Sequence, residues 1–197
     1  MFIDLSLPFH AEYLSLYQEI NTGCWHDLEK GKITPEELRT KRFKLLLDAL
    51  GLEANPDHCS ESYLQNLSQI STMLEGAEEI LEYLVKHYQL MVVTNGLAQV
   101  QHKRIQPIAH YFQDLLISEE LGVSKPDRGF FDEAFKRMDH PFPKDVLIVG
   151  DSLSSDMKGG YCYGIDTCWC NPRGLSNLDD IGITYEITSI CELKSFL

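Results

Sequence analysis

Two aspartates follow an apolar segment in the second half of the chain, and their carboxylate oxygens are suitable ligands for a metal ion. Residues 146–149 read VLIV, and Gly150, Asp151 and, farther along, Asp156 follow them. Mg²⁺ prefers oxygen ligands and commonly takes only one or two protein carboxylates, together with water and substrate oxygens. The same pattern is also typical of a polar loop, because a carboxylate such as Asp156 is favourable near the start of a helix. We therefore expect Asp151 and Asp156 to be the metal ligands if this loop binds a cation, with a structural loop as the alternative.

A hydroxyl and an ammonium follow two other apolar segments. Thr94, Asn95 and Gly96 come after residues 90–93, which read LMVV. A hydroxyl and backbone amides at the end of a strand can bind a phosphate. Lys125 precedes a proline, which favours extended backbone at the lysine, and an ammonium there can neutralise a phosphate or a carboxylate. Each feature alone also fits a polar turn or a surface lysine, so the prediction depends on their occurring together.

The elements that must position these residues differ between the two halves of the chain. The first half has only helical spacing of apolar residues, and residues 34–37 (TPEE) are typical of a helix start with a capping box. The second half alternates short apolar runs with amphipathic stretches, as in a parallel sheet covered by helices on both faces. We therefore predict an α/β fold, a doubly wound Rossmann-like parallel sheet, with a helical domain at 1–72 and an α/β domain at 73–197. In such a sheet the ligand lies at the carboxyl ends of the strands. Strands are expected at 90–94, 115–118, 146–149, 166–170 and 185–188, and helices at 8–29, 35–50, 56–67, 77–88, 130–138, 155–163 and 190–196.

Composition narrows the class of protein. The 197 residues include 17 Lys and Arg against 30 Asp and Glu, a net charge of −13, and 44% of them are hydrophobic. This apolar content excludes wholesale disorder, and the acidic balance argues against nucleic acid as the main partner. No run is long enough to span a membrane, and the N-terminus does not resemble a signal peptide. We expect a cytoplasmic protein with reduced thiols, in which Cys168 and Cys170 lack the second pair that a zinc site needs.

Thr94, Lys125 and the pair Asp151 and Asp156 follow one another along the chain, each at the end of a predicted strand. In this order they resemble the second, third and fourth motifs of the haloacid dehalogenase-like hydrolase superfamily. The resemblance runs along essentially the whole chain. Residues 117–126 (ISEELGVSKP) and 150–156 (GDSLSSD) are very typical of it, and the helical first half resembles the family's cap domain. Within the superfamily, residues 25–34 and 167–171 look most like the pyrimidine 5′-nucleotidase subgroup.

This resemblance implies a Mg²⁺-dependent phosphatase acting on a small phosphomonoester, with a nucleoside monophosphate as the expected substrate. In the family an Asp attacks phosphorus and forms an aspartyl-phosphate, which water then hydrolyses. The cap helices would select the leaving group, and Trp25 or Tyr17 would either stack on a base or pack in the core. On this basis the expected catalytic residues are Thr94, Lys125 and Asp151, the substrate-binding residues are Thr94, Asn95, Gly96 and Lys125, and the metal ligands are Asp151 and Asp156.

One part of the family pattern has no match. Members begin with a strand that ends in Asp-x-Asp-x-Thr, whose first Asp is the nucleophile and whose second is the general acid/base, and this sequence contains no such motif. Asp4 follows two apolar residues, but Ser6 stands in the place of the acid/base and Trp25 follows too closely, so Asp4 is not expected to be the nucleophile. The resemblance places the missing strand between those that end at Thr94 and Asp151. Its absence would leave two strand edges with unpaired backbone groups.

Three explanations stay open for the missing strand: a truncated product or misassigned start, a strand supplied by a partner, or a relative without catalysis. For the chain as written we predict negligible phosphatase activity. The alternative function is a non-catalytic binding subunit that keeps the phosphate pocket, and a homo-oligomer is one of the expected states. A dehalogenase on the same fold fits less well, because Thr94 and the acidic pair suit phosphoryl transfer.

Overall fold

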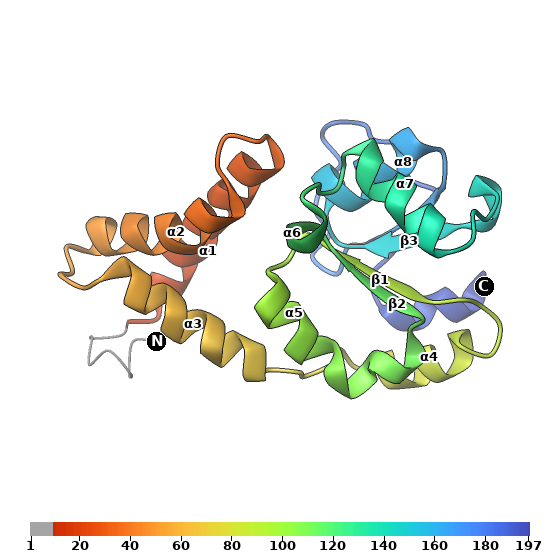
Figure 1. Cartoon of the computed structure of the whole chain (residues 1–197), viewed down its shortest axis with the longest axis horizontal. Helices are drawn as coiled ribbons and strands as arrows, with labels where there is room; N and C mark the ends of the chain where they lie inside the picture. The colour runs from red at the N-terminus through yellow and green to blue at the C-terminus, as the bar shows by residue number, and fades with distance from the viewer. Residues whose placement is uncertain (1–9) are drawn as a thin grey trace. The chain divides into compact units, whose positions relative to one another are not determined.

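Three helices make up the first part of the chain in the computed structural model, which describes residues 10–197 (Figure 1). They are α1 (Glu12–Glu29), α2 (Pro35–Leu50) and α3 (Pro56–Gln69). Residues 10–70 form a compact helical unit together with 99–104. Asp4 lies outside the described residues.

The ends of α2 are set by local side-chain and backbone chemistry. The Glu37 N–H donates to Thr34 Oγ1 at 3.1 Å, and the Thr34 N–H donates to Glu37 Oε2 at 2.8 Å. These two bonds satisfy N–H groups that the first helical turn leaves without partners. The helix ends at Gly51, whose φ of 63° lies in the left-handed region that favours glycine. Both ends of α2 were predicted from the sequence, and the structure confirms them.

Aromatic rings from all three helices form the core of the helical unit. The Tyr17 ring of α1 stacks on Phe43 of α2 with centroids 5.8 Å apart, and Tyr63 of α3 lies 5.3 Å from Phe43. Desolvation by burial raises the pKa of Tyr17, so its hydroxyl stays neutral and acts as a hydrogen-bonding group. Tyr17 therefore packs in the core, which is the second of the two roles expected for it.

Arg42 on α2 is a buried cation in this unit. Only 3% of its surface is exposed, and its Nε has no hydrogen-bond partner within residues 10–197. Its Nη1 donates to Asn21 Oδ1 at 2.9 Å, and the guanidinium carbon lies 4.9 Å from the centre of the Tyr63 ring. None of the ion pairs among the described residues includes Arg42. Within residues 10–197 the charge is desolvated without a counter-charge, which is unfavourable in a protein interior.

Replacing Arg42 with methionine is therefore expected to leave the melting temperature unchanged or to raise it. The desolvation penalty that the change removes is several kcal/mol, which exceeds the roughly 0.5–2 kcal/mol of cation–π attraction from neighbouring rings. Thermal unfolding followed by circular dichroism measures the effect. Arg42→Lys is the control, because it keeps the charge and loses the planar stack. A larger drop for Arg42→Met than for Arg42→Lys would show that the guanidinium stabilises the unit.

Parallel strands alternate with helices in the second unit, residues 71–98 and 105–197. β1 (Met91–Thr94) pairs with β2 (Asp114–Ile117), and β4 (Asp166–Cys170) pairs with both β3 (Leu147–Gly150) and β5 (Tyr185–Ile187). Within the described chain the strands thus form two parallel sheets, β1–β2 and β3–β4–β5. The register places Val92 opposite Leu115, Ile148 opposite Thr167, and Trp169 opposite Glu186.

Side chains of β4 show how helices cover both faces of the larger sheet. Neighbouring residues of a strand point to opposite faces. Cys168 packs with Ile80 of α4 (Ala77–Leu84) and with Leu193 of the C-terminal turn, whereas Trp169 packs with Phe131 of α7 (Arg128–Arg137). Figure 1 shows α7 and α8 (Lys158–Tyr163) on the same side of β3. The remaining elements are α5 (Ala98–Ile105), α6 (Ser118–Leu121), the 3₁₀ turns Gln106–Tyr111, Pro143–Asp145 and Ile190–Ser195, and the π-helical turn Leu153–Met157.

Several predicted helices differ from the structure in their bounds or type, by one to four residues at most ends. α4 ends at Leu84 instead of continuing to Tyr88. The helix expected at 190–196 is a 3₁₀ turn, because so short a segment gains little from helical hydrogen bonds after nucleation. The helix expected at 155–163 begins as a π-helical turn, in which the Met157 N–H donates to the Ser152 carbonyl at 3.1 Å. Among the helices described, none combines the length and the apolar character that crossing a bilayer requires.

Candidate phosphate and metal site

The turn after β1 is held by side chains that bind backbone groups. Thr94 is the last residue of β1, and its Oγ1 accepts a hydrogen bond from the Gly96 N–H at 2.9 Å. Asn95 Nδ2 donates to the Lys125 carbonyl at 2.9 Å, and the Lys125 N–H donates to Asn95 Oδ1 at 3.0 Å. This reciprocal pair fixes Lys125 beside the end of β1.

The Lys125 ammonium lies inside the second unit with 5% of the residue exposed. Nζ donates to the Val93 carbonyl at 2.8 Å and to Asp156 Oδ1 at 2.7 Å. Hydrogen bonds between charged groups are stronger than neutral ones, so the lysine is held firmly. An ammonium has three N–H donors, and two of those on Lys125 have acceptors within the described chain. The third donor is available to an oxygen atom of a ligand.

Asp156, the ion-pair partner of this ammonium, is also buried, with 7% exposed. Its Oδ2 accepts a hydrogen bond from the Ser152 N–H at 3.2 Å. Gly150, the last residue of β3, lies directly against the carboxylate: a Cβ on Gly150 would overlap the carboxyl group and stand 2.8 Å from the Asp156 Cβ. Glycine is required here by close packing, since any side chain would displace Asp156.

Asp151, unlike Asp156, is exposed. Its carbonyl accepts a hydrogen bond from Trp169 Nε1 at 3.1 Å, which fixes the loop after β3 against β4. Burial, together with the negative charge of Asp151, raises the pKa of Cys170, and burial raises the pKa of Cys168 to about 11. Both thiols therefore stay protonated near neutral pH and are poor metal ligands.

A profile of the family described as haloacid dehalogenase-like hydrolase matches residues 34–170, which is more than half of the chain. The matched range contains all of the residues just described at the ends of β1 and β3. The chain belongs to the haloacid dehalogenase-like hydrolase family.

Curated relatives are similar to this family member along 94–100% of its length. HAD-hydrolase YfnB of Bacillus subtilis is 35% identical over 199 residues, which cover 100% of this chain and 85% of YfnB. The crystal structure of YfnB bound to magnesium matches with a TM-score of 0.93, covering 98% of this chain and 86% of that chain. Pyrimidine 5′-nucleotidase YjjG of Escherichia coli is 34% identical over 100% of this chain and 88% of its own length. Pyrimidine 5′-nucleotidase PynA of Streptococcus pneumoniae is 34% identical over 94% of this chain and 79% of its own length.

The oxygen atoms after β3 fit the donor preference of a hard cation. No group of three or more His, Cys, Asp and Glu side chains within residues 10–197 is arranged to hold a metal ion. Mg²⁺ needs no such group, because it commonly keeps several waters and takes one or two carboxylates. Asp156 Oδ1 is bound to the Lys125 ammonium, whereas the Asp151 carboxylate is exposed. Asp151 is therefore the candidate direct ligand in this haloacid dehalogenase-like chain, and Asp156 the candidate for orienting a bound water.

The backbone amides after β1 are less available to a phosphate than the sequence suggests. The Gly96 N–H already binds Thr94 Oγ1, and the N–H of Ala98 at the start of α5 donates to Glu119 Oε2 at 2.8 Å. The Thr94 hydroxyl accepts one bond and keeps its own hydrogen to donate. Thr94 and Lys125 are thus the stronger candidates for binding a phosphate, and Asn95 positions Lys125.

Sequence reasoning did not select Ser152 or Trp169, although both support the loop that carries the two acids. Ser152 binds Asp156 through its backbone, and its Oγ accepts a hydrogen bond from the Ser155 N–H at 3.2 Å. A serine immediately before a helical turn is a cap signal that could have identified it. The bond from Trp169 to Asp151 depends on strand pairing, and no local signal indicates it.

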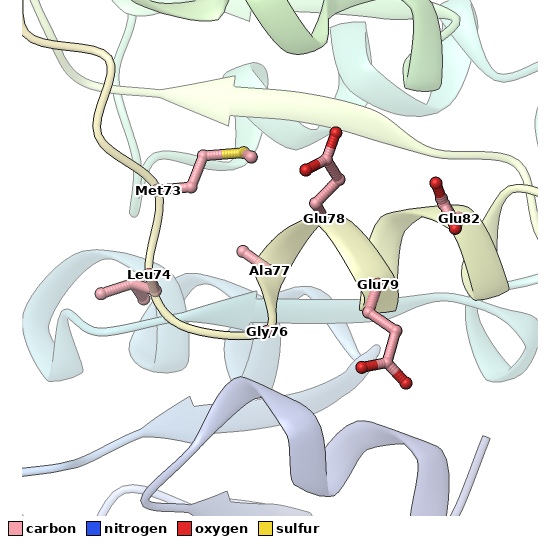
Figure 2. A pocket seen from close by; sticks show the side chains of 7 residues that line it. All are labelled: Met73, Leu74, Gly76, Ala77, Glu78, Glu79 and Glu82. Carbon is pink, nitrogen blue, oxygen red and sulfur yellow. The ribbon is translucent and has the colours of Figure 1, made fainter.

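A separate hollow of about 420 Å³ lies at the start of α4 (Figure 2). Figure 2 shows three acidic side chains among its lining residues, Glu78, Glu79 and Glu82. Lys194 forms an ion pair with Glu79 at 2.6 Å. A hollow with this excess of carboxylates does not suit an anionic ligand, so the strand ends are the better candidate for binding a phosphate.

Proposed function

We propose that this chain binds a small phosphomonoester at Thr94 and Lys125, and that the ligand is a pyrimidine nucleoside monophosphate. The observation that carries the proposal is the buried Lys125 ammonium, which is fixed by the Val93 carbonyl and Asp156 and has a third donor without an acceptor among residues 10–197. The nucleoside part of the proposal is supported by the two relatives named pyrimidine 5′-nucleotidase. In this proposal residues 73–197 are the core domain and residues 1–72 are the cap.

The chain's own residues would act mainly through electrostatic positioning of the phosphoryl group. Thr94 would donate its hydroxyl hydrogen to one phosphate oxygen, and Lys125 would neutralise another. Asp156 would hold the ammonium in place through the 2.7 Å ion pair. Magnesium bound at Asp151 would supply further positive charge to the phosphate oxygens. The magnesium in the YfnB structure supports this part of the proposal.

The reaction also needs a nucleophile, and the sequence contains no Asp-x-Asp pair to provide the family's aspartate. Asp156 is unsuited to attack phosphorus, because it is buried and paired with Lys125. We therefore propose that the chain as written belongs to a phosphatase lineage, binds a phosphomonoester and hydrolyses it at a negligible rate.

A phosphatase assay tests the proposal directly. Uridine 5′-monophosphate, cytidine 5′-monophosphate and p-nitrophenyl phosphate are supplied with Mg²⁺, and released phosphate is measured. We expect turnover far below the ~1 s⁻¹ at the low end of ordinary enzymes. Turnover at or above that rate would contradict the claim of inactivity, and loss of it in Asp4→Asn would then identify Asp4 as the nucleophile.

Calorimetry with uridine 5′-monophosphate and Mg²⁺ tests binding separately from turnover. Thr94→Val keeps the shape of the side chain and removes the hydroxyl. A hydrogen bond to a charged group contributes about 1.5–3 kcal/mol, so the variant should bind at least about tenfold more weakly. Ser154→Ala is a matched loss of a hydroxyl, which among the described residues binds Ser152 Oγ at 3.3 Å, and should leave the affinity unchanged. If the unmodified chain gave no heat of binding, the proposal that it binds this nucleotide would be contradicted.

The second candidate function is a non-catalytic binding subunit that keeps the phosphate pocket. It is favoured by the buried ion pair between Lys125 and Asp156, in a sequence that contains no Asp-x-Asp motif. Nucleotide binding without turnover, even when a strand carrying the motif is supplied, would select it over the phosphatase lineage.

A further inference from the structure

Trp169 is the largest of the fully buried side chains among the described residues, with 1% of its surface exposed. It lies on β4 and, in the register of the sheet, stands opposite Gly150 at the end of β3. A tryptophan N–H usually has a hydrogen-bond partner when the ring is buried. Here Nε1 donates to the Asp151 carbonyl at 3.1 Å. The acceptor is therefore the backbone of the residue that carries the candidate metal ligand.

The same indole ring also lies beneath the turn that carries the second acid. Trp169 belongs to one apolar cluster with Met157, which is 0% exposed, and Leu153 packs against that cluster. Leu153 and Met157 are the first and last residues of the π-helical turn, and Asp156 lies within it. Residues 151–157 are thus attached to β4 by a hydrogen bond at their start and by apolar packing along the turn.

The Asp151 carboxylate depends on this attachment more than the Asp156 carboxylate does. Asp156 is fixed by Lys125 Nζ and by the Ser152 N–H. The Asp151 side chain is exposed, and within residues 10–197 the structure gives its carboxylate no hydrogen bond or ion pair. Only its backbone is held, through the carbonyl. Both carboxylate oxygens therefore stay available to a cation.

We propose that Trp169 is a positioning residue of the candidate site, whose indole N–H fixes the backbone of Asp151 and so directs its carboxylate toward a magnesium ion. Mg²⁺ demands near-ideal octahedral geometry, so a displaced ligand lowers its affinity. Groups that orient a metal ligand without touching the metal change metal affinity about 10–100-fold when they are lost. The magnesium part of this inference rests on the proposed function, whereas the placement of the loop by Trp169 does not.

The test removes the N–H and keeps the ring. Replacing Trp169 with 3-benzothienylalanine puts sulfur in the place of the indole N–H, so the bicyclic side chain still fills the core and donates no hydrogen bond. Phe131→Leu is the matched control, because Phe131 is 3% exposed in the same apolar cluster and its loss of packing leaves the bond from Trp169 to Asp151 in place.

Amide hydrogen exchange of the whole chain measures the loop directly. The Ser152 N–H donates to Asp156 Oδ2, and the Asp156 N–H donates to the Ser152 carbonyl at 3.0 Å. We expect these two amides to exchange about tenfold faster in the benzothienylalanine variant, since the loop opens more often without its bond to β4. The amides that join β4 to β5 should exchange as before. Unchanged exchange at Ser152 and Asp156 would overturn the inference.

Calorimetry with MgCl₂ measures the consequence for the ion. The benzothienylalanine variant should bind Mg²⁺ at least about tenfold more weakly than the unmodified chain. Phe131→Leu should lower the melting temperature and leave the Mg²⁺ affinity unchanged. A tryptophan that only packs in the core would give the reverse result, equal Mg²⁺ affinity in all three chains, and this outcome would contradict the inference while the proposed function stood.

The two proposals therefore fail separately. If the unmodified chain gave no heat with MgCl₂, the magnesium part of the proposed function would be contradicted. The exchange rates at Ser152 and Asp156 would then decide alone whether Trp169 positions the loop, because that measurement needs neither metal nor nucleotide.

Discussion

Lys125→Met is expected to lower the free energy of unfolding by about 3–5 kcal/mol, the usual effect of removing one partner of a buried ion pair. The substitution leaves the Asp156 carboxylate, 7% exposed, without its cation at 2.7 Å. It also removes the hydrogen bond to the Val93 carbonyl. Urea unfolding followed by circular dichroism measures the change, which is large beside the ~5–15 kcal/mol that stabilises a typical domain.

A double variant separates the effect of charge from that of packing. Lys125→Met with Asp156→Leu removes both charges, and replacing a buried pair with apolar side chains is often neutral. We therefore expect the second substitution to recover much of the lost stability while nucleotide binding stays absent. Lys194→Met breaks an exposed pair with Glu79 and is the matched control, expected to change stability little. If Lys125→Met lowered the free energy of unfolding no more than Lys194→Met does, the buried ion pair would contribute no more to stability than the exposed one.

Local chemistry explains why most elements could be predicted from the sequence. The capping box at Thr34 depends on residues within one helical turn, and so does the cap at Asp127, whose Oδ1 accepts a hydrogen bond from the Gly129 N–H at 2.7 Å. The strands followed from short apolar runs, and β4 begins and ends where it was predicted. Such signals act over a few residues and do not depend on the rest of the fold.

The internal arrangement of the site could not be predicted in the same way. Lys125 was expected at a strand end, but its acceptors on Val93 and Asp156 lie 32 and 31 residues away along the chain. Asn95 was expected to bind a phosphate, and the structure adds that its side chain holds the backbone of Lys125 from 30 residues away. These contacts are set by how the strands are placed in the fold, and a single sequence carries no local record of that.

Gly150→Ala is the second change expected to have a large effect, because one methyl group there displaces Asp156. An added Cβ would overlap the Asp156 carboxyl group and stand 2.8 Å from its Cβ, so the acid or the end of β3 must move. Overpacking of this kind costs about 1–3 kcal/mol. Displacing Asp156 also removes the partner that holds the Lys125 ammonium in place. We expect reduced stability in urea and loss of uridine 5′-monophosphate binding in the same variant.

Gly23→Ala is the matched control for this prediction. Gly23 lies inside α1, and outside its own helical turn a Cβ there would meet no atom of the described residues within 4 Å. Alanine in a helix interior is more favourable than glycine by roughly 0.5–1 kcal/mol, so Gly23→Ala should be equally or more stable and should bind nucleotide as before. The same chemical change is thus expected to act in opposite directions at the two positions, because only at Gly150 does the backbone lie against a carboxylate. Unchanged binding in Gly150→Ala would show that Asp156 can leave Lys125 without affecting the phosphate site.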